Sequence, residues 1–204
     1  MSQRHNSPLQ WFRLMTKFTF EPLAINGVGI IHTHKLFDSR GHFSEVYNVK
    51  RFEEIGIYCR FVQDNQAVSK LSGIIRGLHF QLPPLAQAKL VRVVRGSIFD
   101  VVVDLRTDSR SYGTWCSAVL TAIGGEQLFV PRGFAHGYCT MEADTEVFYK
   151  VDNYYSAGLD AGIAWDDPDI NIKWPFSRDK LSTSSKDAGL PHLKSICSPF
   201  VSAQ

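Results

Sequence analysis

The chain has 204 residues, 44% of them hydrophobic, and its 22 basic and 20 acidic side chains leave a net charge of only +2. This length and hydrophobic content suit one domain with a sizeable core, and so small a charge argues against a general nucleic-acid or membrane surface while allowing a basic pocket for a small anionic ligand. No run of eighteen apolar residues occurs and the N-terminus lacks an apolar signal region, so we expect a cytoplasmic protein without a membrane span.

The organised pattern is expected to begin at Phe18, after a loosely attached extension over residues 1–17. One amphipathic helix is predicted over Val49–Ile55, because Asn48 can cap its start and Gly56 can end it. Residues 18–204 should form one domain, whose tail from about residue 175 is rich in Ser, Pro and Lys. We expect this tail to be irregular, or a short helix, and to wrap around the domain.

The rest of the pattern consists of short β-rich runs separated by clusters of Gly, Pro, Ser and Asp. Such a series predicts an all-β fold, an antiparallel barrel or jelly roll with a few short helices. The predicted strands are Ile30–Phe37, Cys59–Ser69, Ile74–Gln81, Lys89–Val94, Ile98–Leu105, Trp115–Thr121, Gln127–Val130, His136–Met141 and Glu146–Asp152.

Two of these strands, on either side of Arg95-Gly96, are predicted to pair as a hairpin, because glycine can adopt the positive φ of a tight turn. In the second strand the odd positions are all apolar, whereas the even positions include Asp100 and Asp104, so its two faces differ. The pairing would place Lys89 diagonally opposite Asp100, as a fixed cation inside a concave sheet. A solvated charge ladder on an exposed face is the competing interpretation.

The stretch Pro131-x-Gly133-x-x-His136 predicts a turn that delivers a histidine to the barrel interior. Its spacing resembles the second motif of cupin proteins. In metal-dependent cupins the first motif supplies an H-x-H pair and a Glu. The matching position here reads His79-Phe80-Gln81, so only the imidazoles of His79 and His136 could converge, and no metal site is expected. The four widely spaced cysteines contain no CxxC pair and predict reduced thiols.

Several motifs in a fixed order give a more specific indication. From about Phe18 to Asp187 the sequence resembles the dTDP-4-dehydrorhamnose 3,5-epimerase family. The motifs that carry the resemblance are RGLHFQ from Arg76, KLVR from Lys89, FDVVVDLR from Phe99, PRGFAHGY from Pro131, Tyr149-Lys150, Tyr154-Tyr155 and WDDPDINIKWPFS from Trp165.

The resemblance implies a cupin-like jelly roll that forms a homodimer with exchanged strands. It implies an enzyme that uses neither a metal nor an organic cofactor and acts on a dTDP-linked 4-keto-6-deoxy sugar, with no nucleic-acid or membrane partner. The expected reaction inverts C3, C5 or both, and relatives that invert one centre only leave the number of centres open. Two hypotheses from different functional classes compete with this one: a sugar-nucleotide-binding module without catalytic activity, and a metal-dependent cupin enzyme.

The same resemblance implies the catalytic residues. His79 matches the base, and Asp187 matches the carboxylate that orients its imidazole. Tyr149 matches the proton donor on the opposite face, and Lys89 matches the cation that receives the developing oxyanion at C4. From the predicted hairpin, Asp100 is expected to hold Lys89.

A larger set of residues matches the substrate-binding positions of the family. The set includes cations for the nucleotide and its phosphates, polar groups around the thymidine, aromatic side chains for stacking, and the polar wall of the site. Arg40, Phe43 and Glu45 are expected to reach across the dimer. The full set is Arg40, Phe43, Glu45, Gln63, Asp64, Asn65, Arg76, His136, Tyr155, Asp160 and Lys186. The sequence departs from the family at Asp160, where a glutamate is usual, and by one extra residue before Ser185.

Overall fold

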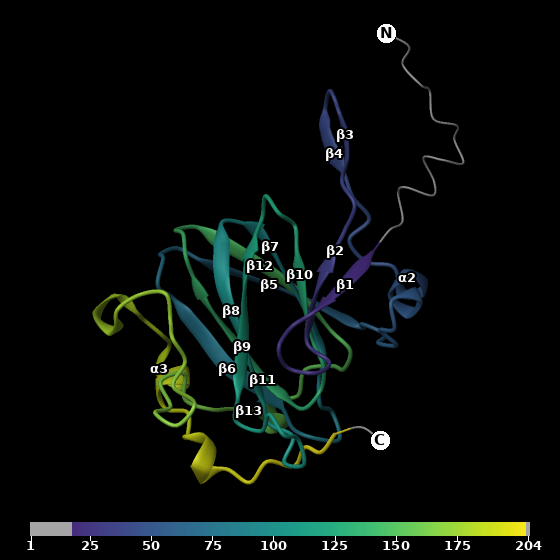
Figure 1. Ribbon diagram of the computed structural model, residues 1–204. Coiled ribbons are helices and arrows are strands. Elements are labelled where there is room, and N and C mark those ends of the chain that lie inside the picture. Colours follow the sequence, from purple (N-terminus) through teal and green to yellow (C-terminus); the bar gives the residue numbers. More distant parts are fainter. Residues whose placement is uncertain (1–17, 203–204) are drawn as a thin grey trace.

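Two antiparallel sheets packed face to face form a jelly-roll barrel in the computed structural model, which describes residues 18–202 (Figure 1). The predicted extension, residues 1–17, lies outside the described part. One sheet has the order β1 (Thr19–Pro22), β2 (Gly29–His32), β10 (Gln127–Val130), β7 (Lys89–Arg95), β12 (Thr145–Val151) and β5 (Gln63–Ser69). The other has the order β13 (Asp160–Gly162), β6 (Ile75–Gln81), β11 (Phe134–Thr140), β8 (Ser97–Asp104) and β9 (Trp115–Thr121). The predicted all-β fold is therefore confirmed.

The main hydrophobic core lies between the two sheets. Val91 of β7 and Leu128 of β10 belong to the same buried cluster as Val102 of β8, as expected for inner faces that interdigitate. The alternate residues of β8, such as Val101 and Val103, belong to a second cluster on the other side of the five-stranded sheet. Both faces of β8 are therefore buried. One face packs into the core between the two sheets, and the other packs into the second cluster.

The predicted hairpin over residues 89–105 is wrong. β7 pairs with β10 and β12, whereas β8 pairs with β11 and β9, so the chain crosses from one sheet to the other at Gly96. Gly96 does have the expected positive φ, +75°. A local turn signal of this kind cannot distinguish a hairpin from a crossing between sheets, because a sharp reversal of the chain needs the same backbone freedom in both cases.

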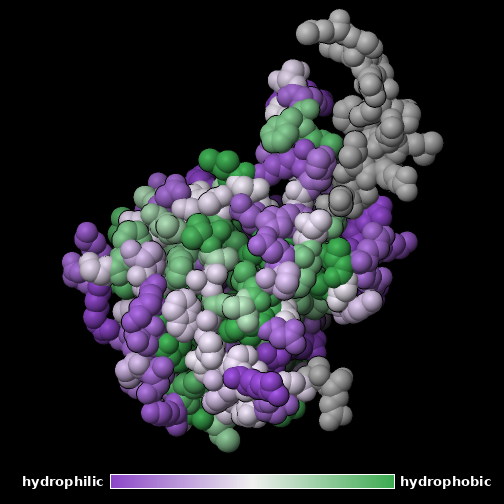
Figure 2. Space-filling model, in the orientation of Figure 1, coloured by the Kyte–Doolittle hydropathy of each residue, from purple (hydrophilic) through white to green (hydrophobic). Residues whose placement is uncertain are grey.

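The helix predicted at Val49 is α2 (Val49–Glu54), and the side chain of Asn48 caps it by accepting the N–H of Lys50 at 3.1 Å. The predicted strand Ile30–Phe37 is two strands, β2 and β3 (Leu36–Asp38). β3 pairs with β4 (Gly41–Phe43) in a hairpin that projects from the barrel (Figure 1). Figure 2 shows hydrophobic and hydrophilic groups side by side on this projection, where Phe37 is 73% and Phe43 59% exposed.

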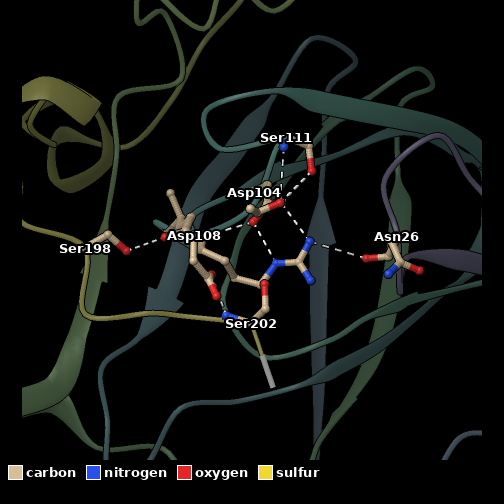
Figure 3. A network of polar contacts seen from close by, with 9 residues as sticks. Asn26, Asp104, Asp108, Ser111, Ser198 and Ser202 are labelled. Atoms are coloured by element: carbon tan, nitrogen blue, oxygen red, sulfur yellow. Dashed lines mark hydrogen bonds and ion pairs between the residues drawn. The ribbon is translucent and has the colours of Figure 1, made fainter. Parts of the chain in front are cut away.

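The C-terminal tail lies against the barrel (Figure 1). Its short helices are η2 (Arg178–Lys180), α3 (Ser185–Ala188) and η3 (Leu193–Ser195), whereas η1 (Ala157–Leu159) directly precedes β13. The last residues are fixed by a polar network in which the Ser198 hydroxyl donates to the Leu105 carbonyl and Asp108 accepts the N–H of Ser202 (Figure 3). Asp104 stands at the centre of this network and bonds Arg106. Within residues 18–202 no helix is long and apolar enough to cross a membrane.

Candidate active site

A cavity of about 460 Å³ opens between the two sheets. His79 of β6, Lys89 of β7, Tyr149 of β12 and Asp187 of α3 all line it, so four of the five predicted catalytic residues come together. A second cavity of about 220 Å³ shares His79, Lys89 and Tyr149 with the first. The two cavities therefore form one elongated site with these three residues at their junction.

His79 forms the predicted contact with Asp187, because its Nε2 lies 2.8 Å from Oδ1 of the carboxylate. Asp187 is 5% exposed and is held from two further sides, by the N–H of Gly77 on its second oxygen and by its own N–H, which donates to Ser184. The extra residue before Ser185 does not separate the pair. Burial lowers the pKa of His79, while the bond and the charge of Asp187 oppose this shift. The imidazole is thus oriented and unprotonated near neutral pH.

Lys89 is a buried cation, only 8% exposed, whose Nζ donates to the carbonyl of His79 at 3.1 Å. Burial lowers its pKa to about 8, although the charges of Asp100 and Asp160 act in the opposite direction. Asp100 does not form an ion pair with it, contrary to the hairpin-based prediction. Its Oδ1 lies 2.6 Å from Nε2 of His136, so this carboxylate acts on Lys89 only through its charge.

Tyr149 reaches the cavity from the sheet opposite His79, since β12 and β6 belong to different sheets. Burial raises the pKa of its phenol, which therefore stays protonated near neutral pH. A ligand between the sheets would meet an unprotonated imidazole on one side and a hydroxyl donor on the other. This is the arrangement that removal and return of a proton on opposite faces requires.

The second cavity collects five of the predicted nucleotide-binding side chains, namely Gln63, Asn65, Tyr155, Asp160 and Lys186. Lys186 forms an ion pair with Asp160, which also accepts the hydroxyl of Tyr155 at 3.1 Å. The hydrogen bond with Asp160 raises the pKa of Lys186, so Lys186 stays positively charged near neutral pH. Asp64 lines neither cavity and instead pairs with Lys150 at 2.7 Å.

Arg76 and His136 line the larger cavity. The guanidinium of Arg76 donates to the hydroxyl of Ser69 and the carbonyl of Val68 on β5, which fix its direction. His136 is the third residue of β11, so the predicted turn does deliver it to the barrel interior, directly opposite His79 in the strand pairing.

Like Asp64 and Asp100, the predicted residues Arg40, Phe43 and Glu45 do not line either cavity of this chain. Arg40 follows β3 and pairs with the neighbouring Asp38 at 2.6 Å. Phe43 ends β4, and Glu45 accepts a hydrogen bond from Asn48. All three belong to the segment that projects from the barrel or to its base.

Tyr138 lines the larger cavity together with His136, although no motif predicted it as a site residue. Its position two residues after His136 on the same strand was the available signal, because alternate residues of a strand share a face. Thr183 and Ser184 of the tail also line this cavity. Their position could not be foreseen, since no local pattern places an irregular segment against a sheet. Among the described side chains, no group of three or more His, Cys, Asp or Glu residues could hold a metal ion.

Comparisons with known proteins identify the family of the chain. The family model for dTDP-4-dehydrorhamnose 3,5-epimerase matches residues 22–195. The dTDP-4-dehydrorhamnose 3,5-epimerase of Sinorhizobium fredii is 48% identical over 188 residues, which are 91% of this chain and 93% of the relative. The Bacillus anthracis epimerase, solved with TDP and PPi bound, superposes with a TM-score of 0.83 at 43% identity over 86% of this chain and 99% of its own.

The Legionella pneumophila epimerase, solved in complex with dTDP-4-keto-L-rhamnose, gives a TM-score of 0.86 at 36% identity over 92% of this chain and 100% of its own. Sequence and fold thus agree over nearly the whole chain. The oriented imidazole, the buried cation and the opposed phenol lie in a jelly roll of the same architecture, and this protein is an epimerase that belongs to the dTDP-4-dehydrorhamnose 3,5-epimerase family.

Proposed function

We propose that the protein inverts C3 and C5 of dTDP-4-dehydro-6-deoxy-glucose and so produces dTDP-4-dehydro-L-rhamnose for deoxysugar biosynthesis. The observation that carries the proposal is the position of His79 and Tyr149 on opposite sheets of one cavity, with Lys89 at the junction. Hydrogens on carbons beside a keto group are acidic enough to be removed when the resulting oxyanion is stabilised. The site supplies a group for each part of that reaction.

His79 acts as the base. Its Nε2 is engaged by Asp187 at 2.8 Å, so the other ring nitrogen, Nδ1, takes the proton from carbon. The C–H electron pair moves into the ring carbon–carbon bond, and the C4 carbonyl becomes an enolate oxygen. Asp187 stabilises the imidazolium that forms and keeps the ring in position.

Lys89 stabilises the enolate oxygen at C4, since a buried ammonium interacts far more strongly with a developing charge than an exposed one. Tyr149 then returns a proton to carbon on the face opposite His79, and the configuration inverts. The phenol regains its proton, and His79 loses one, through exchange with water. His136 and its partner Asp100 complete the polar wall of the cavity.

The nucleotide occupies the second cavity, where Gln63, Asn65 and Tyr155 surround the thymidine and Lys186 binds the diphosphate. Arg76 reaches the diphosphate from the larger cavity. We propose that Arg40, Phe43 and Glu45 complete this pocket from the second subunit of a homodimer with exchanged strands. The exposure of Phe37 and Phe43 on the projecting hairpin supports this assembly. The four unpaired cysteines within residues 18–202 fit a cytoplasmic location.

The proposal is tested by incubating the protein with dTDP-4-dehydro-6-deoxy-glucose in heavy water and following deuterium by NMR. Deuterium should enter at both C3 and C5, with the product in the L-rhamno configuration. Exchange at one carbon only would make the protein a single-centre epimerase of a related deoxysugar, and no exchange would contradict the proposed reaction. His79→Asn serves as the control, since it removes the base and should abolish exchange at both carbons.

A further inference from the structure

Tyr138 carries a buried hydroxyl that the proposed reaction does not use. The residue lies on β11, two positions after His136, and both side chains point toward the barrel interior. Tyr138 is 5% exposed and lines the same cavity as His79 and Tyr149. Within residues 18–202 its phenol oxygen is one of the few buried side-chain atoms without a hydrogen-bond partner. Buried hydroxyls are nearly always bonded, so this one is available to a ligand.

The neighbouring strands do not supply the missing partner. Across β8, Tyr138 is paired with Asp100, one oxygen of which contacts His136 while the other is also without a partner. Across β6, it is paired with Arg76, whose guanidinium donates to β5 instead. Burial raises the pKa of Tyr138, so its hydroxyl stays protonated and can both donate and accept.

We propose that Tyr138 is a specificity-determining residue whose hydroxyl exchanges a hydrogen bond with a hydroxyl of the bound hexose. The inference rests on the proposed function and names a further contact in the same site. Tyr138 lines the cavity where the sugar chemistry is assigned and does not line the second cavity, which is assigned to the nucleotide. A neutral group that donates and accepts matches a sugar hydroxyl, whereas diphosphate oxygens are better served by Arg76 and Lys186.

The test compares Tyr138→Phe with the unaltered protein by calorimetric titration with dTDP and with dTDP-glucose, which lacks the keto group and is not turned over. The substitution removes one oxygen, so dTDP-glucose should bind roughly 3- to 10-fold more weakly while dTDP binds equally well. Tyr112→Phe is the matched control, because Tyr112 is 39% exposed and lines neither cavity of the site. It should change neither affinity.

The melting temperature of the unliganded Tyr138→Phe protein should be equal to or above that of the unaltered protein, since no bond within the chain is lost. Unchanged affinity for dTDP-glucose would overturn the inference, because Tyr138 would then only fill space. An equal loss for dTDP and dTDP-glucose would also overturn it, by placing the contact on the nucleotide. If the unaltered protein binds neither ligand, the proposed function itself fails and this inference falls with it.

Discussion

If His79 is the proposed base, its charge state sets the acid side of the pH profile. The base acts only when unprotonated, and burial holds its pKa below the ordinary value of 6.5. We expect kcat/KM to stay high somewhat below that pH and to fall as the pH drops through the lowered pKa. Asp187→Asn removes the charge that raises this pKa, so the acid limb should move to lower pH while the plateau rate decreases. An acid limb at the same pH in both proteins would show that another group controls it.

Lys89 couples activity to stability. Its pKa of about 8 in the fold lies below the ordinary 10.5, so the buried charge destabilises the folded state below pH 8, and this cost disappears as the pH rises from about 8 to 10.5. Lys89→Met should therefore increase the free energy of unfolding at neutral pH, by at most on the order of 3 kcal/mol. It should also lower kcat about 10²- to 10³-fold with little change in substrate affinity.

Urea unfolding and steady-state kinetics on the same preparation would check both effects. The alkaline limb of the kcat/KM profile should lie near pH 8 in the unaltered protein, where Lys89 loses its proton. A variant that loses affinity alone would assign Lys89 to binding, and one that loses stability as well as activity would contradict the buried-charge argument.

At the scale of elements, the crossing between the two sheets depends on Gly96. Its φ is +75°, and an added Cβ would lie 2.4 Å from Oγ1 of Thr145, the first residue of β12. Gly96→Ala should therefore reduce the free energy of unfolding by about 1–3 kcal/mol in chemical denaturation. Gly158→Ala is the control, because no atom lies within 4 Å of the added carbon, and it should change stability little. Equal stability of the two variants would contradict the role given to Gly96.

The elements also show where sequence reasoning succeeds and where it stops. The helix at Val49 was predictable because Asn48 and Gly56 are local signals that act within a few residues. The partner of β7 was not predictable, because pairing joins residues 89–95 to strands far along the chain. The contact of Asp187 with His79 followed from the family resemblance alone, since the two residues are 108 positions apart in the sequence.

At the scale of the whole molecule, we expect two subunits to share each site. Arg40→Ala and His79→Asn should each be inactive as a pure protein, because one lacks a contact given to the partner and the other lacks the base. Unfolding the two together and refolding them should restore activity, since each heterodimer would contain one intact site. The activity of the mixture, measured after separation of the heterodimer, checks this expectation.

The control for that experiment is a mixture of His79→Asn with Lys89→Met. Both residues line the same cavity of one chain, so their heterodimer would contain no intact site and should stay inactive. Activity in this control would show that subunits exchange more than the projecting segment. Inactivity of the Arg40→Ala mixture, with the heterodimer isolated, would contradict the shared site.

The residues proposed for the two faces of the reaction belong to separate layers of the fold. The proposed base, His79, lies on β6 in the five-stranded sheet, whereas the proposed cation and proton donor, Lys89 and Tyr149, lie on β7 and β12 in the six-stranded sheet. The bond from Lys89 to the carbonyl of His79 joins the two layers within the site. In evolutionary terms, a substitution in either layer would therefore act on both carbons, because C3 and C5 would share one base, one cation and one proton donor.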